Sequence, residues 1–594
     1  MHKNKSMKPE NYGNYKVDNN KIIYVDPDDK EEKVISDHVK IKEILQNIET
    51  NEIKLILEYW YHNRMHEMEI SRQSLSKYEI RKLLKYGVDV YEHKADRVAH
   101  FLSIQETYAP KEYMHSHLGW AVHEDSPIYK HDHIISSEEQ FSRYDGELTL
   151  ESSGTYDEWQ SIIEEEVLGV TTLELALVFG FSSVVVGYLA QEIDLDSLVI
   201  HIWGDSTKGK TTAAKLVVSP FGKPTTSQGG LLHTWNGTPN SLINKLANNR
   251  GIPFVLDESS MGNINDFTKM IYQLAGGIEK SRLTKEAKQR ERQTWATTII
   301  STAEKSLLSN ASQNIGQMMR LFEFDNITWT RDAMNADNLR HGVESHYGHA
   351  GPLFAKYLLE QEEGYVKEKW KAWSQTLFNQ MQEVDRFSDR IANKLSLLLV
   401  TADLVREALN IPLNIDGISN LLIQQNQQSQ GSRDIGENAL EAIKAKIYEH
   451  NSKFEKEHPP GDLESNGYEC WGRIKKGGKF TEVYILPHKF RELLMECGFE
   501  DERVVLADWK QKKYIKHDSG TYQKKTSIKK IDEDLKHNDG RVKTYCILLP
   551  KDALSVKETK QLPARKRPVP SQKGNDSQLK NMLEGKEGGD SNGI

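Results

Sequence analysis

The most informative segment of the sequence is Gly204-Asp205-Ser206-Thr207-Lys208-Gly209-Lys210-Thr211, which matches the phosphate-binding pattern G-x-x-x-x-G-K-[ST] at every fixed position. Residues 198–203, directly before it, are apolar and β-branched and predict a buried strand. Residues 211–218, directly after it, carry Ala, Lys and Leu in helical spacing. The pattern has meaning only between a strand and a helix, and the sequence predicts both.

The residue types of this loop suit a nucleoside triphosphate. Gly204 and Gly209 let the backbone bend so that successive N–H groups face phosphate oxygens at the positive end of the following helix. Lys210 is expected on the outer phosphates and the Thr211 hydroxyl on Mg²⁺. The alternative is a glycine-rich turn that contains Lys-Thr by chance. We expect ATP and Mg²⁺ as cofactors, with the nucleotide bound by Gly204, Asp205, Ser206, Thr207, Lys208, Gly209, Lys210, Thr211 and Thr212.

A second signal follows in residues 252–258, an apolar strand that ends in Asp257-Glu258. A strand beside the phosphate-loop strand would bring Asp257 to the magnesium shell and Glu258 to the attacking water. The two carboxylates would have different tasks, because one stays ionised on the metal while the other accepts a proton or orients the water. The alternative is an ordinary helix cap after a strand.

The composition gives no overall positive field, since 87 acidic residues face 78 basic ones and the formal charge is −9. Binding to nucleic acid must therefore depend on local patches. The three cysteines are too few and too scattered for a disulfide framework, which favours a reducing compartment. The polar N-terminus predicts no secretory signal, so we expect a cytoplasmic protein. The apolar run of residues 171–190 predicts a buried helix and no membrane association.

The sequence predicts a multidomain α/β protein. At 594 residues it has room for roughly three or four domains. Composition shifts divide it into a disordered leader (1–20), a mixed α/β N-terminal domain (21–154), a central P-loop ATPase domain (155–423), a polar linker (424–433), a C-terminal winged-helix DNA-binding domain (434–550) and a disordered tail (551–594).

The N-terminal domain holds a histidine cluster whose role the sequence leaves open. Two His-x-His pairs on strands could hold a zinc ion, but no carboxylate or thiolate ligand spacing accompanies them. Packing or surface histidines are the favoured alternative. The cluster comprises His115, His117, His123, His131 and His133.

A basic segment follows the acidic strand and predicts an insertion that projects from the core. Its lysines and arginines would neutralise phosphates of a nucleic-acid backbone whatever the base sequence. A solvated helix face is the alternative. The DNA-binding candidates here are Lys280, Arg282, Lys285, Lys288, Arg290 and Arg292.

Further catalytic candidates come from the next strand and two helices. The strand 294–300 ends in Ser301-Thr302, of which one hydroxyl is expected to position the water at the γ-phosphate. Arg320, at the entry to a later strand, is the candidate arginine finger for a neighbouring subunit's site, with a structural ion pair as the alternative. Arg386 or Arg390 is expected to be a second sensing arginine, and Arg390 is preferred.

The block from Gly467 to Pro550 predicts two helices followed by a basic β-ribbon, the order of a winged helix. In such a module phosphate contacts position the protein on a DNA duplex. The DNA-binding candidates in it are Lys512, Lys513, Lys524 and Lys525, with Lys510, Lys529 and Lys530 nearby.

Four segments together resemble the proteins grouped by the DUF927 ATPase domain: residues 115–120 (HSHLGW), 203–212 (WGDSTKGKTT), 256–258 (LDE) and 300–304 (ISTAE). The resemblance is strongest to the cassette chromosome helicases of staphylococcal mobile elements, which are similar to the MCM helicases of the AAA+ class. It covers most of the chain, including the winged helix. The first sensor of many AAA+ proteins is Asn, whereas this strand ends in Ser301-Thr302.

This resemblance implies an AAA+ ATPase that assembles into a ring, usually a hexamer, and threads single-stranded DNA through its pore. We therefore predict an ATP-dependent DNA helicase that acts in replication of a mobile genetic element, with duplex or forked DNA at the winged helix. The alternatives are a DNA-binding initiator or transposition-type regulator that uses ATP as an assembly switch without unwinding, and a nucleotide-dependent signalling ATPase.

Overall fold

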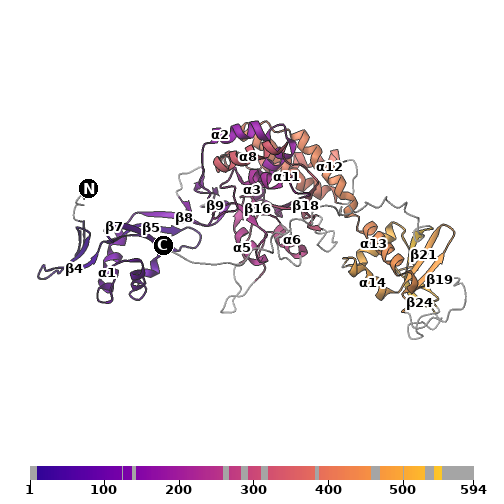
Figure 1. The fold of residues 1–594 in the computed structure, drawn as a ribbon, viewed down its shortest axis with the longest axis horizontal. Helices are drawn as coiled ribbons and strands as arrows, with labels where there is room; N and C mark the ends of the chain where they lie inside the picture. The colour runs from indigo at the N-terminus through magenta and orange to yellow at the C-terminus, as the bar shows by residue number, and fades with distance from the viewer. Residues whose placement is uncertain are drawn as a thin grey trace, which may run out of the picture. The chain divides into compact units, whose positions relative to one another are not determined.

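The computed structural model describes residues 10–123, 125–136, 142–258, 267–281, 292–308, 319–381, 387–456, 469–499, 501–528 and 541–551. The chain forms two compact units (Figure 1). The first comprises Met1–Ala439 with Leu494–Val505, and the second comprises Leu440–Leu493 with Leu506–Ile594.

The first unit begins with an antiparallel sheet in the order β1-β2-β3-β4. Its strands are β1 (Glu10–Tyr12), β2 (Tyr15–Asp18), β3 (Lys21–Val25) and β4 (Glu32–Asp37). The leader predicted for residues 1–20 is therefore wrong from residue 10 onward, while residues 1–9 lie outside the described part. The rings of Tyr12 and Tyr15 are buried against Phe101, and this packing offsets the polar composition that suggested disorder.

A second N-terminal sheet has the strand order β12-β8-β5-β6-β7. Buried residues alternate with mostly half-buried ones along β5 and β6, so that one face packs on the core. Helix α1 (Glu92–Gln105) and the short 3₁₀ turns Arg72–Leu75, Ile80–Tyr86 and Glu106–Tyr108 complete this part. The strands are β5 (Val39–Asn47), β6 (Ile53–Tyr61), β7 (Arg64–Ser71), β8 (Lys111–His115) and β12 (Arg143–Tyr144).

A third sheet joins the N-terminal part of the chain to the central part. Its order is β11-β10-β9-β15, and β15 pairs parallel with β9. The strands are β9 (Leu118–His123), β10 (Ser126–Lys130), β11 (Ile134–Ile135) and β15 (Asn249–Arg250). Because β15 comes from the region predicted as the ATPase domain, a cut between residues 154 and 155 would divide one continuous sheet.

The central sheet has five strands in the order β14-β16-β17-β13-β18, and all four neighbouring pairs are parallel. They are β13 (Leu198–Trp203), β14 (Leu232–Thr234), β16 (Phe254–Asp257), β17 (Thr298–Ala303) and β18 (Leu321–Asp325). The expectation that the acidic strand lies beside the phosphate-loop strand is wrong, because β17 lies between β16 and β13. β17 also begins later than the predicted strand 294–300.

Helices cover both faces of this sheet, with α3, α8 and α11 on one side of β16 and β18 and α5 and α6 on the other (Figure 1). Helix α3 is long and apolar enough to cross a membrane, but 89% of its apolar window is buried inside the protein, as a core helix requires. The helices are α2 (Tyr156–Ile162), a π-helical turn (Ile163–Val167), α3 (Thr171–Leu189), α4 (Lys210–Val218), α5 (Pro239–Leu246), α6 (Phe267–Gly276), α8 (Ala333–Ser345), α9 (Ala350–Leu359), α10 (Tyr365–Gln380), α11 (Ser388–Leu409) and α12 (Ile415–Arg433).

The linker predicted for residues 424–433 is wrong, because these residues form the last turns of α12. The segment is rich in Gln, which is polar but has a good helix propensity, so its composition did not exclude a helix. Helix α13 (Ile435–Glu449) follows after a single residue, Asp434.

The chain after α13 contains a sheet in the order β19-β20-β21-β24-β22, with β23 also paired to β24. Phe490, Trp509 and Tyr545 pack their rings together in the second unit. The elements are β19 (Phe454–Lys456), β20 (Gly472–Lys476), β21 (Phe480–Ile485), α14 (Pro487–Glu496), α15 (Glu502–Gln511), β22 (Ile515–Lys516), β23 (Lys524–Thr526) and β24 (Val542–Pro550).

Candidate active site

The loop between β13 and α4 turns through three residues with positive φ. Gly204 has φ 141°, Thr207 has φ 67° and Gly209 has φ 79°. Such φ values are ordinary for glycine, but they strain the backbone of a threonine. Backbone strain of this kind is concentrated at functional loops. A Cβ at Gly209 would also lie 2.7 Å from two side-chain atoms of Thr330, so a side chain fits here neither by conformation nor by space.

The N-terminus of α4 faces this loop, and no side chain caps it. Its first-turn N–H groups are therefore available to an anion at the positive end of the helix. The Lys210 ammonium donates to the carbonyl oxygens of Gly204 and Asp205, at 2.9 and 2.7 Å. These bonds hold the amine over the loop, where a phosphate would replace the carbonyls as its acceptor.

Residues from two other strand ends support the same loop. The Ser206 hydroxyl donates to the Glu304 carboxylate, directly after β17. After β18, the Trp329 backbone N–H donates to the Lys208 carbonyl at 2.8 Å. The Lys208 ammonium lies 3.4 Å from the Thr328 hydroxyl. The segment 328–330 was not predicted from the sequence, because it carries no motif. It reaches the loop only because β18, which precedes it, lies beside β13 in the sheet.

The paired carboxylates lie at the end of β16, and Thr302 of the neighbouring strand contacts both residues. The Thr302 hydroxyl donates to an Asp257 carboxylate oxygen. It accepts the Glu258 backbone N–H at 3.0 Å. Glu258 itself has φ 60°, so the chain turns sharply after Asp257. Thr302 is 2% exposed, which makes these bonds strong relative to bonds in water.

Ser301 has a different environment, although it is the next residue on the same strand. Its hydroxyl lies 3.0 Å from His201 Nδ1 and accepts the Trp235 indole N–H at 3.0 Å. All three side chains are buried. Burial lowers the pKa of His201 to about 4, so this imidazole is neutral at pH 7. Of the two predicted hydroxyls, that of Thr302 therefore contacts the Asp257 carboxylate and the Glu258 backbone N–H, whereas Ser301 packs inside the sheet layer.

The parallel order of the sheet brings these parts together. The carboxyl ends of β13, β17 and β16 lie at one edge, and they carry the loop, Thr302 and Asp257-Glu258 in that sequence across the sheet. Backbone donors, one ammonium and hard oxygen ligands from Thr211 and Asp257 form a set that fits a triphosphate with Mg²⁺. The arrangement can hold phosphates and orient a water for in-line attack.

Arg320 lies away from this edge, immediately before β18 and therefore at the amino ends of the parallel strands. Its guanidinium is 5.0 Å from the Tyr272 ring centroid and 4.0 Å from an Asp196 carboxylate oxygen. The structure does not bring it to the loop of its own chain.

Arg390 is exposed in the first turn of α11. One turn later the Lys394 ammonium donates to the Asp196 carbonyl at 2.8 Å, and burial lowers the pKa of Lys394 to about 8. Because Asp196 precedes β13, this end of α11 faces the amino edge of the sheet, opposite the loop. Arg386 lies outside the described residues.

The basic segment of residues 280–292 is joined to the fold by an antiparallel stem. The Glu279 N–H donates to the Gln293 carbonyl, the Trp295 N–H donates to the Gly277 carbonyl, and Ile278 bridges Thr294. Lys280 and Arg292 flank the segment at its two ends. Arg282, Lys285, Lys288 and Arg290 lie outside the described residues.

The lysines predicted to contact DNA near the C-terminus lie in the turn after α15 and on β23. Lys512 forms an ion pair with Asp508 at 2.8 Å, and Lys524 forms one with Asp518 at 2.6 Å. Lys513 has φ 61° in the turn after α15, and Lys525 lies on β23. Lys510 and its ring contact with Tyr522 lie in the same unit, whereas Lys529 and Lys530 lie outside the described residues.

The histidine cluster is distributed through the core and surface of the first unit. His115 and His131 are buried and lie 2.8 and 2.7 Å from the carbonyl oxygens of His131 and Phe221. His117 contacts Asn248, His133 contacts Asp132, and His123 is exposed. Within the described ranges no group of three or more His, Cys, Asp or Glu residues could hold a metal ion.

Comparison with known proteins agrees with this organisation. A model of a domain of unknown function, DUF927, matches residues 14–294, and a model of the Cch helix turn helix domain matches residues 434–552. The chain is similar to a solved structure titled "SCCmec type IV Cch - active helicase", with a TM-score of 0.73 and 24% sequence identity over 92% of this chain and 100% of that chain. A search of curated proteins gives no match.

The similarity to the solved structure covers almost the whole chain, and at this identity it shows the fold. The two domain models fall on the two parts of the sequence that resembled the DUF927 proteins and a C-terminal DNA-binding module. The resemblance predicted from the sequence is thereby confirmed. The chain is a mixed α/β multidomain protein that has the fold of the Cch helicase structure and carries a DUF927 domain followed by a Cch helix-turn-helix domain.

Proposed function

We propose that this protein is an ATP-dependent DNA helicase of the AAA+ class. One observation carries the proposal: in the order β14-β16-β17-β13-β18, three adjacent strand ends present the loop 204–211, Thr302 and the pair Asp257-Glu258 at one edge of the sheet. A glycine-rich turn or a simple helix cap would not need all three at the same edge. The fold similarity to a protein titled an active helicase supports the same conclusion.

The chain's own residues would divide the chemistry of phosphoryl transfer between them. The N–H groups of the loop and Lys210 bind the phosphates of ATP, and the Thr211 hydroxyl with the Asp257 carboxylate would hold Mg²⁺. The ion, when bound, neutralises charge on the β- and γ-phosphate oxygens. Glu258 orients and deprotonates the attacking water, and Thr302 holds Asp257 and the Glu258 backbone in position. The reaction needs no covalent intermediate, because positioning and charge stabilisation lower the barrier.

Arg320 would complete the site of a neighbouring subunit in a ring, which we propose to be a hexamer. Its place at the amino edge of the sheet, far along the strands from its own loop, supports a role in trans. Mixing Arg320→Ala subunits with Lys210→Ala subunits tests this. Mixed rings should regain part of the ATPase activity, because some interfaces combine an intact loop with an intact arginine. Absence of recovery at every mixing ratio would exclude a shared site.

DNA would contact the protein in two places. The basic segment 280–292 would face single-stranded DNA in the pore, and the C-terminal helix-turn-helix domain would bind duplex or forked DNA with a winged-helix geometry through Lys512, Lys513, Lys524 and Lys525. We place this activity in the bacterial cytoplasm, in replication of a mobile genetic element. The division into an ATPase domain near residues 155–423 and a DNA-binding domain near 434–550 belongs to the same proposal.

Unwinding of forked DNA with a 3′ or a 5′ single-stranded tail is the decisive experiment. The wild-type chain should unwind one of the two substrates with ATP, and Glu258→Gln should bind ATP without unwinding either. Unwinding that persists in Glu258→Gln would contradict the mechanism. ATP-dependent DNA binding by the wild type, with no unwinding of either substrate, would instead indicate an initiator or regulator that uses ATP as an assembly switch.

A further inference from the structure

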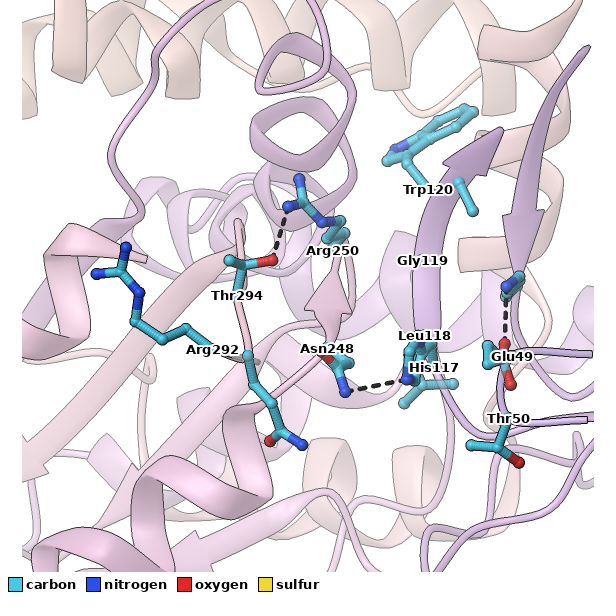
Figure 2. Close-up of a pocket in the computed structure, with 13 residues that line it drawn as sticks. Glu49, Thr50, His117, Leu118, Gly119, Trp120, Asn248, Arg250, Arg292 and Thr294 are labelled. Carbon is cyan, nitrogen blue, oxygen red and sulfur yellow. Dashed lines mark hydrogen bonds and ion pairs between the residues drawn. The ribbon is translucent and has the colours of Figure 1, made fainter. Parts of the chain in front are cut away.

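A pocket of about 570 Å³ lies where the N-terminal part of the first unit meets the stem of the basic segment, and it is separate from the site described above. Figure 2 shows Arg250, Arg292 and Thr294 on one side and His117, Glu49 and Thr50 on the other. Its volume is within the range of ligand-binding cavities. The pocket adjoins β15, which precedes β16, so it lies toward the amino end of the acidic strand.

The positive charge of this pocket is only partly neutralised. Lys130 pairs with Glu49 at 2.7 Å, and both side chains are less than 10% exposed, so this pair contributes no net charge. The Arg250 guanidinium donates to the Thr294 hydroxyl at 2.8 Å (Figure 2). Among the described residues, neither Arg250 nor Arg292 has a carboxylate within ion-pair distance. Two guanidinium groups thus remain for an external anion.

The backbone holds Arg250 firmly in this position. β15 runs between β9 and helix α3, so close to both that a Cβ at Gly119 would lie 2.0 Å and a Cβ at Gly187 2.4 Å from the Arg250 carbonyl oxygen. Burial lowers the pKa of Arg250, which is half-buried. Partial burial without an acidic partner disfavours the charged guanidinium, and an anion bound beside it would offset that cost.

We infer that this pocket binds the backbone of single-stranded DNA, with Arg250 on one phosphate and Arg292 on a neighbouring one. Guanidinium groups match the planar geometry of a phosphate and donate two hydrogen bonds to it. The hydroxyls of Thr50 and Thr294 and the amides of Asn248 and Gln293 supply neutral donors around the same space. Trp120 is 2% exposed and its N–H donates to the Val184 carbonyl, so it offers no face on which a base could stack. The pocket would therefore recognise the DNA backbone and not the bases.

Continuity with the basic segment favours DNA as the source of the phosphate. Arg292 ends that segment, and Gln293 and Thr294 form the second strand of its stem. Arg292 itself lines the pocket, so a DNA strand bound at this end of the segment would reach the pocket directly. This inference rests on the proposed function, since it assigns part of the DNA path to Arg250, a residue that no sequence motif indicates.

Binding of fluorescein-labelled oligo(dT) to the full chain, followed by anisotropy at several salt concentrations, tests the inference. Arg250→Gln and Arg292→Gln should each weaken binding about tenfold, the effect of losing hydrogen bonds to a charged group. Each should also reduce the slope of log affinity against log salt by about 0.7, the value for one phosphate of a single strand. Arg250→Lys should restore the slope but not the full affinity.

Arg340→Gln is the matched control, because Arg340 is a partly exposed arginine that pairs with Asp337 on α8. It should leave both affinity and slope unchanged. Arg292→Gln changes an exposed residue and keeps the test valid if Arg250→Gln fails to fold. Wild-type affinity and slope in folded Arg250→Gln and Arg292→Gln would overturn the inference while leaving the helicase proposal intact. Failure of the wild type to bind oligo(dT) would overturn both.

A nucleotide bound in the same pocket is the competing source of phosphate. Titration of mant-ATP into Lys210→Ala distinguishes the two, since this variant lacks the loop lysine but keeps the pocket. Binding that persists in Lys210→Ala and disappears when Arg250→Gln is added would assign the pocket to a nucleotide and overturn the assignment to DNA. Loss of mant-ATP binding in Lys210→Ala alone supports the assignment to DNA.

Discussion

Removing the Thr302 hydroxyl tests the catalytic geometry more sharply than removing a carboxylate. Thr302→Val keeps the shape of the side chain but abolishes its bond to Asp257 and leaves the Glu258 N–H without its acceptor. Hydrogen bonds to charged groups contribute about 1.5–3 kcal/mol. If this free energy is expressed in the transition state, turnover falls about 10- to 100-fold.

The measurement is steady-state ATPase activity over a range of ATP concentrations. Because the bonds of the Thr302 hydroxyl are to the Asp257 carboxylate and the Glu258 N–H and not to the loop, kcat should fall while KM for ATP stays near the wild-type value. Ser301→Ala is the matched control one residue away. It removes a hydroxyl that bonds His201 and Trp235, so it should lower the melting temperature and leave kcat of the folded protein close to wild type.

Two results would refute this reasoning. The first is a Thr302→Val variant that hydrolyses ATP at the wild-type rate. The second is a Ser301→Ala variant, folded at the assay temperature, that loses as much turnover as Thr302→Val. Either result would mean that the contacts at the end of β17 do not position the reacting groups.

Three further predictions follow from packing and charge. The pKa of His201 is about 4 in the folded chain, against an ordinary value near 6.5. The stabilisation that the neutral imidazole contributes to the free energy of unfolding is therefore present above pH 6.5 and is lost, by about 3 kcal/mol at most, as the pH falls toward 4. Melting temperatures measured against pH should show this loss, and His201→Asn should remove most of it. Gly119→Ala should destabilise the first unit by several kcal/mol, since its Cβ would meet the Arg250 carbonyl at 2.0 Å and its φ is 81°; an unchanged denaturant midpoint would contradict the close packing of β9 on β15. Thr211→Val should raise the Mg²⁺ concentration needed for half-maximal ATPase activity about tenfold, since the change removes one of the proposed oxygen ligands; equal Mg²⁺ dependence of variant and wild type would exclude that ligand.

The strand, loop and helix around Gly204–Thr211 were predictable from sequence because each has a strong local signal. Residues 198–203 are apolar except for His201, and the predicted strand agrees with β13 residue for residue. The start of α5 has a local signal of the same kind, since Thr238 caps the helix and proline occupies its first position. Each of these features depends on residues that are close together in the sequence, and a sequence pattern therefore shows it directly.

The order of the strands could not be predicted in this way. Nothing local to residues 298–303 indicates that they insert between β13 and β16, and the error about the neighbour of the acidic strand follows from that. The distinction between Ser301 and Thr302 depends on the same order, because adjacent residues of a strand face opposite sides. Arg250 was missed for a similar reason: its significance comes from partners more than 40 residues away, Thr294 among them.

The pairing of β15 with β9 limits how this protein can be divided or recombined. A chain beginning at residue 155 would lose β9, leaving the backbone groups of Asn249 and Arg250 as an open strand edge and removing Trp120 from its contacts with Gly187 and Gly251. Such a fragment would be prone to aggregate. The DUF927 match, which spans residues 14–294, covers both strands. An exchange of domains between relatives should therefore keep both strands from the same parent, because they pair with each other within one sheet.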